Sequence, residues 1–254
     1  MQVRSPARWG QGREYFMERL MRAGMNLKKT KGIDVPYGNV LISGPTGCGK
    51  SNLLRQMLVR TAREFRPTRM SFVIFDPKRV DFAFAGQIPH LLFPVVRSAE
   101  DEEKAYDFLT KENLLRDAFL QKGGRLSQMQ YLIVIVDELD ALNDPKQMAK
   151  FFVEAKKTRR LVFFWVASQN EDLLSGMVEG SDYRFVFAPE DQAGLSEADK
   201  NALALPGNYL LVESSSDKQK SLVHSELMSE RALKQSLRIL AKSSTYQKGA
   251  SPKK

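Results

Sequence analysis

The sequence predicts an α/β fold with a mainly parallel central sheet, flanking helices and additional antiparallel strands at one edge. Two observations carry this prediction. Short, continuously apolar runs alternate with segments of helical periodicity from residue 40 to about residue 180, as expected for parallel strands that are covered on both faces. After residue 183 strand-like runs follow one another with little helix between them, which indicates an extension of the sheet that is partly antiparallel.

The apolar runs and helical patterns give the expected elements in order. Strands are expected at 40–42, 72–75, 93–96, 132–136, 161–167, 183–187, 209–213 and 221–224. Helices are expected at 12–28, 50–65, 99–120, 144–158, 170–179 and 225–241. We expect three parts: a basic helical lead at 1–36, a main α/β domain at 37–225, and a C-terminal helix with a basic, disordered tail at 226–254.

Composition narrows the class of protein. The chain has 254 residues, a formal net charge of +9 and one cysteine, Cys48, which excludes an internal disulfide and favours a reducing compartment. No apolar run is long enough for a membrane span and the N-terminus does not resemble a signal peptide, so we expect a cytoplasmic protein. The basic balance favours a polyanion partner, nucleic acid or a membrane surface, although the charge could also serve solubility alone.

A complete phosphate-binding motif follows the first expected strand. Gly44, Pro45, Thr46, Gly47, Cys48, Gly49, Lys50 and Ser51 match G-x-x-x-x-G-K-[ST], and Asn52 begins the helix after them. These nine residues would surround the phosphates of ATP at a helix N-terminus, with the backbone N–H groups of all but Pro45 as donors. Lys50 would contact the β- and γ-phosphates, and the Ser51 hydroxyl would bind Mg²⁺. A chance match in an unrelated turn is the alternative, and the strand–loop–helix context argues against it.

Two acids end the buried run at 132–136. Buried acids without partners are costly, so Asp137 and Glu138 at the carboxyl end of a strand indicate a function. Asp137 would bind Mg²⁺, and Glu138 would orient and activate the attacking water. The alternative is a pair of ordinary acids at a strand exit. The strand segments between the phosphate loop and Asp137 predict that another strand separates the two motifs in the sheet, as in RecA-like P-loop NTPases.

Polar residues also end the next strand. Gln169 is the candidate for a side chain that senses the γ-phosphate and takes part in catalysis, with Ser168 second. The alternative is a helix cap, which Ser168 or Asn170 could supply.

Five segments together resemble the FtsK/SpoIIIE/HerA superfamily of DNA-pumping ATPases. They are the phosphate loop at 44–51, Phe75–Phe82 with its Asp-Pro-Lys, Ile88–Val96 with Ile-Pro-His-Leu-Leu, Ile135–Leu139, and Ala167–Gln169. They occur in the family's order between about residues 38 and 188. The resemblance implies an ATPase that moves double-stranded DNA through a hexameric ring, with ATP and Mg²⁺ held between neighbouring subunits.

The resemblance also implies a cation that reaches the ATP of the adjacent subunit. The family places an arginine before the sensor strand, where this chain has Thr158; Arg159 is our candidate replacement, with Arg160 and Lys157 as alternatives. Each could instead be part of a solvated basic helix end. A second family cation has no match near Pro189–Asp191.

The family's pore-facing loops correspond to the connection before Asp137. There Lys122 and Arg125 flank two glycines and would contact DNA phosphates without reading the sequence; the alternative is a plain flexible turn. Asp76 and Lys78 are expected to orient groups near the nucleotide, whereas His90 is expected to be packed or hydrogen-bonded.

Several functions stay open at this stage. The leading one is a double-stranded DNA translocase for DNA transfer or genome packaging of a mobile element or virus, with a membrane complex or capsid as a possible partner. The alternatives are a protein motor like the type VII secretion ATPases and an ATP-switched assembly module. An ABC-type ATPase is rejected, because its signature-like Leu173-Leu174-Ser175-Gly176 follows Asp137 instead of preceding it.

Overall fold

The computed structural model describes residues 38–158, 160–189, 195–213 and 220–248, which all belong to the compact unit Pro36–Lys254. The elements are β1 (Val40–Ser43), α2 (Lys50–Glu64), β2 (Met70–Phe75), η1 (Ala83–Gln87), α3 (Ala99–Gln121), η2 (Leu126–Gln128), β3 (Tyr131–Val136), η3 (Leu139–Ala141), α4 (Pro145–Lys157), β4 (Val162–Ser168), α5 (Glu171–Ser175), η4 (Val178–Gly180), β5 (Tyr183–Phe187), α6 (Glu197–Leu203), β6 (Asn208–Glu213), β7 (Lys220–His224) and α7 (Glu230–Lys248). Within these ranges no helix has the length and apolar character needed to cross a membrane.

The strands form one seven-stranded sheet in the order β2-β3-β4-β1-β5-β6-β7. The first five strands in this order are parallel, and β6 and β7 are added antiparallel at one edge. This confirms the predicted fold class. One strand does lie between the phosphate-loop strand β1 and the Asp137 strand β3, but it is not one of the segments from which it was predicted, since β2 is the outermost strand. The strand between β1 and β3 is β4, which follows Asp137 in sequence.

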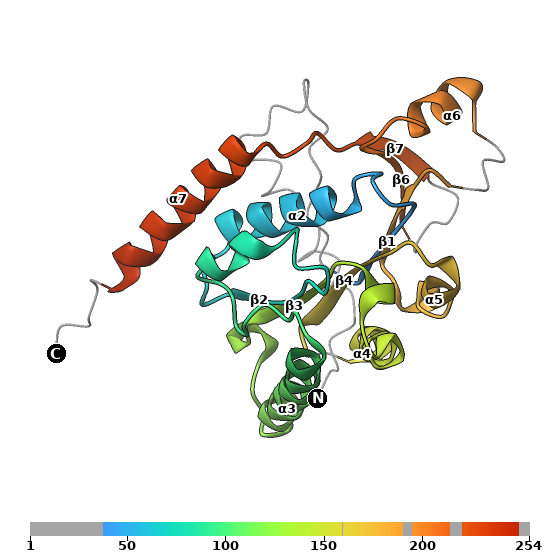
Figure 1. Ribbon diagram of the computed structural model, residues 1–254. Helices are drawn as coiled ribbons and strands as arrows, with labels where there is room; N and C mark the ends of the chain where they lie inside the picture. Colours follow the sequence, from blue (N-terminus) through green and yellow to red (C-terminus); the bar gives the residue numbers. More distant parts are fainter. Residues whose placement is uncertain (1–37, 159, 190–194, 214–219, 249–254) are drawn as a thin grey trace, which may run out of the picture. The chain divides into compact units, whose positions relative to one another are not determined.

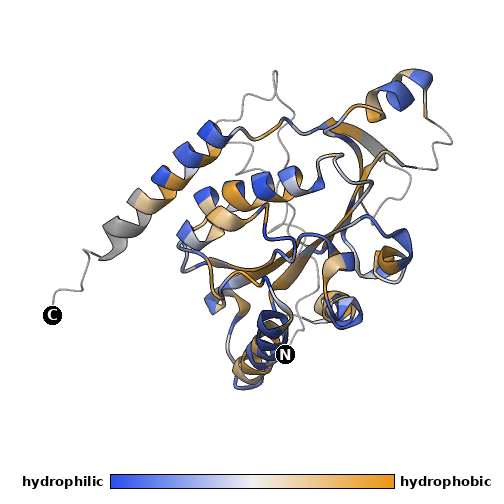
Figure 2. Cartoon of the chain, in the orientation of Figure 1, coloured by the Kyte–Doolittle hydropathy of each residue, from blue (hydrophilic) through white to orange (hydrophobic). Residues whose placement is uncertain are grey.

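Helices cover both faces of the sheet, as Figure 1 shows. Alternate residues of each central strand point to opposite faces. On one face Val134 and Phe164 belong to a core cluster that includes Leu109 of α3, Phe152 of α4 and Leu174 of α5. The other face is covered by α2, against which α7 packs. Figure 2 shows the result: the strands are apolar, while polar residues lie on the outer surfaces of the helices.

The predicted strand at 93–96 is wrong. The chain from Leu91 to Val96 runs beside β2 but bridges it only at its two ends, Phe72 to Leu91 and Phe75 to Val96. Pro94 lies between these bridges and has no N–H to donate, so a continuous ladder cannot form there.

Three helix predictions also need correction. The helix expected at 170–179 is two short pieces, α5 and η4, with Gly176 and Met177 between them. The helix α6 before β6 was not predicted. The last helix begins at Glu230 instead of 225 and continues to Lys248, so residues 242–248 are helical and the expected disorder is wrong for them. The expected helix at 12–28 lies outside the described residues.

A buried asparagine ties the sheet to α4. Asn39, just before β1, is 1% exposed. Its Nδ2 donates to the backbone oxygens of Phe152 at 2.8 Å and Gly180 at 3.1 Å, while its Oδ1 accepts from Phe164 N at 3.0 Å. One side chain therefore satisfies three buried backbone groups from three different segments.

Replacing this residue, in Asn39→Ala, is expected to lower the free energy of unfolding by about 3–5 kcal/mol. The reason is that three buried hydrogen bonds would be lost, and a buried group that loses its partner costs about 1–3 kcal/mol. Urea unfolding followed by circular dichroism measures the change, with the exposed Asn201→Ala as the matched control. A loss below about 1 kcal/mol would show that these bonds do not hold the elements together.

Candidate nucleotide site

The phosphate loop joins β1 to the first turn of α2. All three of its glycines have positive φ, 142° at Gly44, 82° at Gly47 and 117° at Gly49, a region that other residues rarely adopt. At Gly44 a Cβ atom would also lie 2.6 Å from the Cβ of Phe187 in β5, so the loop needs glycine to pass that strand. The Lys50 side chain is buried, and its Nζ donates to Gly44 O at 2.7 Å and Pro45 O at 2.9 Å. The lysine thus lies across the interior of the loop.

The two residues predicted to bind Mg²⁺ are in direct contact. Ser51 Oγ donates to Asp137 Oδ1 at 2.9 Å, which joins the start of α2 to the end of β3. Burial, together with the neighbouring carboxylates Asp81, Glu138 and Asp76, raises the pKa of Asp137 to about 7, and the hydrogen bond from Ser51 acts in the opposite direction. A divalent cation beside this carboxyl group would stabilise its ionised form.

Glu138 is held in an unusual backbone conformation. Its φ is 69° and its ψ 78°, the left-handed region that costs a non-glycine residue roughly 1–2 kcal/mol. The carboxylate is buried; Oε1 lies 3.0 Å from Lys78 Nζ, whereas Oε2 has no hydrogen-bond partner among the described residues. Buried polar atoms without partners are rare, and at this position the free oxygen fits a water molecule that donates to it.

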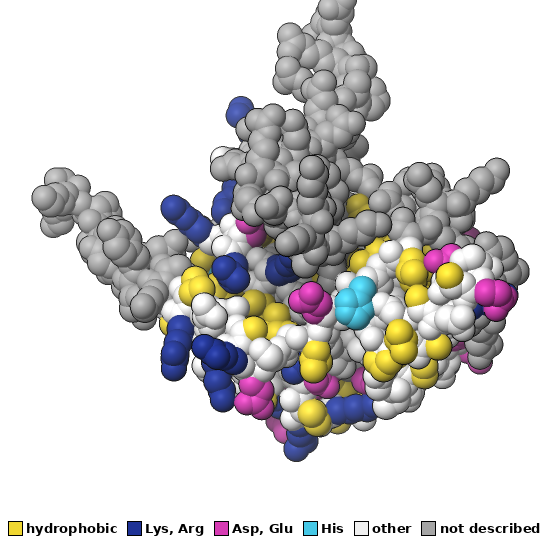
Figure 3. Space-filling model, turned by 90° about the horizontal axis from the view of Figure 1, so that it is seen from above, with side chains coloured by type: hydrophobic (Ala, Val, Ile, Leu, Met, Phe, Trp, Pro, Cys, Tyr) yellow, Lys and Arg dark blue, Asp and Glu magenta, His cyan; other side chains and the backbone are white. Residues whose placement is uncertain are grey.

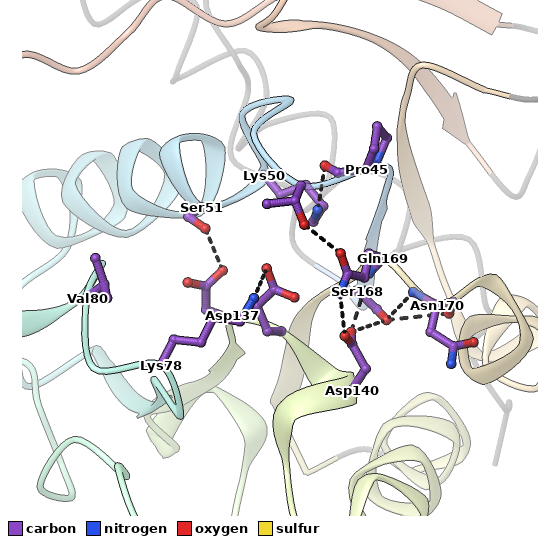
Figure 4. A network of polar contacts seen from close by, with 12 residues as sticks. Pro45, Lys50, Ser51, Lys78, Val80, Asp137, Asp140, Ser168, Gln169 and Asn170 are labelled. Atoms are coloured by element: carbon purple, nitrogen blue, oxygen red, sulfur yellow. Dashed lines mark hydrogen bonds and ion pairs between the residues drawn. The ribbon is translucent and has the colours of Figure 1, made fainter.

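A second carboxylate connects the sensor strand to the phosphate loop. Asp140 Oδ1 accepts from Ser168 Oγ at 2.7 Å, and its Oδ2 accepts from Gln169 Nε2 at 3.1 Å. Thr46 Oγ1 donates to Gln169 Oε1 at 2.6 Å. Partial burial acts to raise the pKa of Asp140, but the hydrogen bonds from Ser168 and Gln169 hold it below its usual value. Gln169 therefore bridges a fixed anion and the tip of the loop, as Figure 4 shows.

These groups fit Mg·ATP. Backbone N–H groups at a helix start and a buried ammonium suit phosphates, and the Ser51–Asp137 pair suits a magnesium ion that takes oxygen ligands. Glu138, with its unpartnered oxygen, directly follows Asp137 at the end of β3. The structure thus brings together the loop residues, Ser51, the two acids and Gln169.

The other predicted residues lie farther from this arrangement. The side chain of Asn52 binds the connector to α7, donating to Glu226 O at 3.0 Å and accepting from Met228 N at 2.9 Å, so only its backbone is free for a nucleotide. Asn170 caps α5, because its Oδ1 accepts from Leu173 N. His90 is buried and contacts Phe65 O at 2.6 Å, which agrees with a packing role.

Two candidates for the trans-acting cation, Lys157 and Arg160, come before β4, at the end of the sheet opposite the phosphate loop. Arg160 is paired with Asp117 through two hydrogen bonds, at 2.7 and 2.5 Å. Lys157, at the end of α4, is exposed, and Arg159 lies outside the described residues. Lys122 and Arg125 are exposed in the turn between α3 and β3, at the same end of the sheet.

Sequence reasoning missed two contacts of this site. It expected Lys78 near the nucleotide but not its ion pair with Glu138, and it did not single out Asp140. A signal for Asp140 existed, since it follows Asp137 by three residues and so belongs to the same strand exit. No periodic pattern in the sequence indicates the ion pair of Lys78 with Glu138, because the two residues follow different strands, β2 and β3.

Comparisons with known proteins agree with this geometry. The model of the FtsK/SpoIIIE family matches residues 16–153, more than half of the chain. The DNA translocase SftA of Bacillus subtilis (strain 168) is 28% identical over 72% of this chain. The chain spans 22% of the length of SftA.

Two solved structures show the same fold. The cytoplasmic domain of the Thermomonospora curvata type VII secretion ATPase EccC has a TM-score of 0.64 at 22% identity, over 82% of this chain and 28% of that chain. The pCW3 conjugation coupling protein TcpA, solved with ATPγS, has a TM-score of 0.60 at 14% identity, over 80% of this chain and 65% of that one.

Proposed function

The chain belongs to the FtsK/SpoIIIE family, and from this premise we propose that it is an ATPase that translocates double-stranded DNA. The observation that carries the ATPase part is the convergence of Lys50, Ser51, Asp137 and Glu138 on one phosphate site. The DNA part is supported by the relationship to the translocase SftA and by a basic surface described below.

In the proposed reaction each residue has one task. Lys50 exchanges its two loop carbonyls for oxygens of the β- and γ-phosphates. Ser51 and Asp137 would hold Mg²⁺, which would neutralise phosphate charge when bound. The free Oε2 of Glu138 accepts a hydrogen bond from the attacking water and orients it. Gln169, already bonded to Thr46 in the loop, changes partners when the γ-phosphate leaves and so reports hydrolysis to Asp140.

We also propose the ring that the family uses, with ATP between neighbouring subunits and Arg159 acting on the ATP of the next subunit. The paired state of Arg160 supports this choice between the two arginines, because its guanidinium is engaged by Asp117.

A basic surface supports the proposal that the substrate is DNA. It lies at the amino-terminal ends of the parallel strands, opposite the nucleotide site. Strands β2, β3 and β4 are parallel, so their amino-terminal ends lie side by side at one end of the sheet. The turns that precede these strands, 65–69, 122–130 and 157–161, therefore lie at that end. These three turns contain no Asp or Glu. Among their described residues, five cations are exposed: Arg66, Arg69, Lys122, Arg125 and Lys157.

Contacts between the turns fix this basic surface. Arg69 Nη1 donates to Ser127 O at 2.9 Å, and Gln130 Nε2 donates to Pro67 O. In Figure 3 Lys and Arg side chains gather on the left, the side on which α2 ends in Figure 1. Among the described residues of these turns no apolar side chain is exposed. A membrane contact would need exposed apolar side chains to insert, so the phosphate backbone of DNA is the better fit as a partner.

Removing pairs of these cations is expected to weaken duplex binding. Two double variants test this: Arg66→Ala/Arg69→Ala and Lys122→Ala/Arg125→Ala. In each, the negative slope of log K against log salt should become shallower by about 2, because each lost phosphate contact contributes about 0.9 to its magnitude. Fluorescence anisotropy of a labelled duplex over a salt series measures this slope. The matched control is Lys146→Ala/Lys150→Ala, two exposed lysines on α4. If all three variants have the same slope, the basic surface does not bind DNA.

Displacement of a third strand from a duplex tests translocation directly. The protein should release a triplex-forming oligonucleotide from a long duplex when ATP is present, and duplex DNA should raise its ATPase rate. Lys50→Ala should do neither. A rate unchanged by duplex DNA, together with no binding at low salt, would contradict DNA translocation and favour a protein motor or an ATP-switched assembly module.

A further inference from the structure

The ion pair between Lys78 and Glu138 has a consequence for hydrolysis. Glu138 is one of the most constrained side chains of the site, because its backbone is in the left-handed region and its carboxylate is buried. One of its oxygens is 3.0 Å from Lys78 Nζ and the other has no partner in the described part of the chain. The lysine therefore determines which oxygen remains available.

Lys78 is itself held in place by a buried carboxylate. Asp76, at the end of β2, is fully buried, and its two oxygens accept from Val80 N at 3.3 Å and Phe82 N at 3.1 Å. Its backbone oxygen accepts from Arg79 N at 3.0 Å. These three bonds fold residues 77–82 into a tight loop that directs Lys78 toward the end of β3, as Figure 4 shows.

We propose that Lys78 is a positioning residue for hydrolysis, which binds Oε1 of Glu138 and so presents Oε2 to the attacking water. A carboxylate with both oxygens free could rotate between several hydrogen-bonding arrangements, only some of which align the water. The ammonium group also compensates the charge of a buried carboxylate. This inference rests on the proposed role of Glu138 and is independent of the DNA substrate.

The side chain of Lys78 is 46% exposed, so its position differs from that of an ordinary buried structural pair. Its stem can be shortened or replaced without opening a cavity in the core, because the loop is held by Asp76 and not by the lysine. A variant at this position should therefore fold and bind ATP normally. The effect should be confined to the rate of the chemical step.

The test uses three variants of the full chain. Lys78→Met keeps the stem and removes the charge, and it should lower kcat for ATP by about 10²-fold with KM changed less than about threefold. Lys78→Arg should restore most of the rate, because a guanidinium can also bind Oε1. Lys104→Met, which breaks the exposed ion pair with Glu100, is the matched control and should have wild-type kinetics.

A double-mutant cycle separates this proposal from the role of Glu138. In single-turnover measurements Lys78→Met should cause no further loss in a Glu138→Gln background, since the lysine acts through that carboxylate. If Glu138→Gln alone leaves the rate intact, the proposed role of Glu138 fails. If Glu138→Gln is slow but Lys78→Met retains or exceeds the wild-type rate, or lowers only the melting temperature, the positioning role of Lys78 fails and that of Glu138 stands.

Discussion

Replacing Glu138 with Gln is expected to lower kcat for ATP by about 10²- to 10⁴-fold, the range associated with a positioned general base. ATP binding should change by less than about threefold, because Lys50, Ser51 and Asp137 keep their places. The amide has nearly the shape of the carboxylate, but its NH₂ group cannot accept the proton or hydrogen bond of the attacking water. Steady-state hydrolysis and binding of a fluorescent ATP analogue measure the two quantities separately.

The control for this variant is Glu171→Gln at the exposed start of α5, which removes one carboxylate without touching the site. It should have the wild-type rate. A Glu138→Gln protein that hydrolyses ATP within about threefold of the wild type would show that another group activates the water. The buried, unpartnered oxygen of Glu138 would then need a different explanation.

Replacing Lys50 with Ala is expected to raise the Kd for Mg·ATP by at least about 10²-fold. The ammonium group would otherwise form hydrogen bonds with two phosphate groups, and a hydrogen bond to a charged group contributes about 1.5–3 kcal/mol. Unlike Glu138→Gln, this variant should lose binding and not only turnover. Isothermal titration with ATP and with ADP measures the loss.

The stability of the Lys50 variant should change little. Its two acceptors, Gly44 O and Pro45 O, belong to residues that are not buried, so water can replace the ammonium group. The exposed Lys111→Ala on α3 is the control for loss of one positive charge. If Lys50→Ala binds ATP as tightly as Lys111→Ala does, the phosphate-loop assignment is wrong.

The phosphate loop and the two acids were predictable because their signals are local. Eight consecutive residues specify the loop. A continuous apolar strand that ends in Asp137 and Glu138 places both acids at the carboxyl end of that strand. The parallel direction of the central strands was predictable from the alternation of apolar runs with helical segments along the chain. The contact of Thr46 with Gln169 was not predicted, although both residues follow neighbouring strands.

The failures have physical causes that single-sequence patterns do not contain. The apolar run at 93–96 looks like a strand, but Pro94 removes a donor from the ladder. Residues 242–248 have a tail-like composition, yet they continue a helix whose earlier turn is anchored by the buried Leu237 and Leu240. The pairing of Lys78 with Glu138 depends on two loops from different strands and on the left-handed backbone of Glu138.

The account depends on one ATP and one magnesium ion held between the turn with Lys50 and the acids that end β3. Isothermal titration calorimetry of the full chain with ATP, with and without Mg²⁺, tests this most directly. We expect saturable binding of about one ATP per chain that strengthens with Mg²⁺ and weakens in Asp137→Ala. No uptake of ATP in the presence of Mg²⁺, or uptake unaffected by both Lys50→Ala and Asp137→Ala, would contradict it.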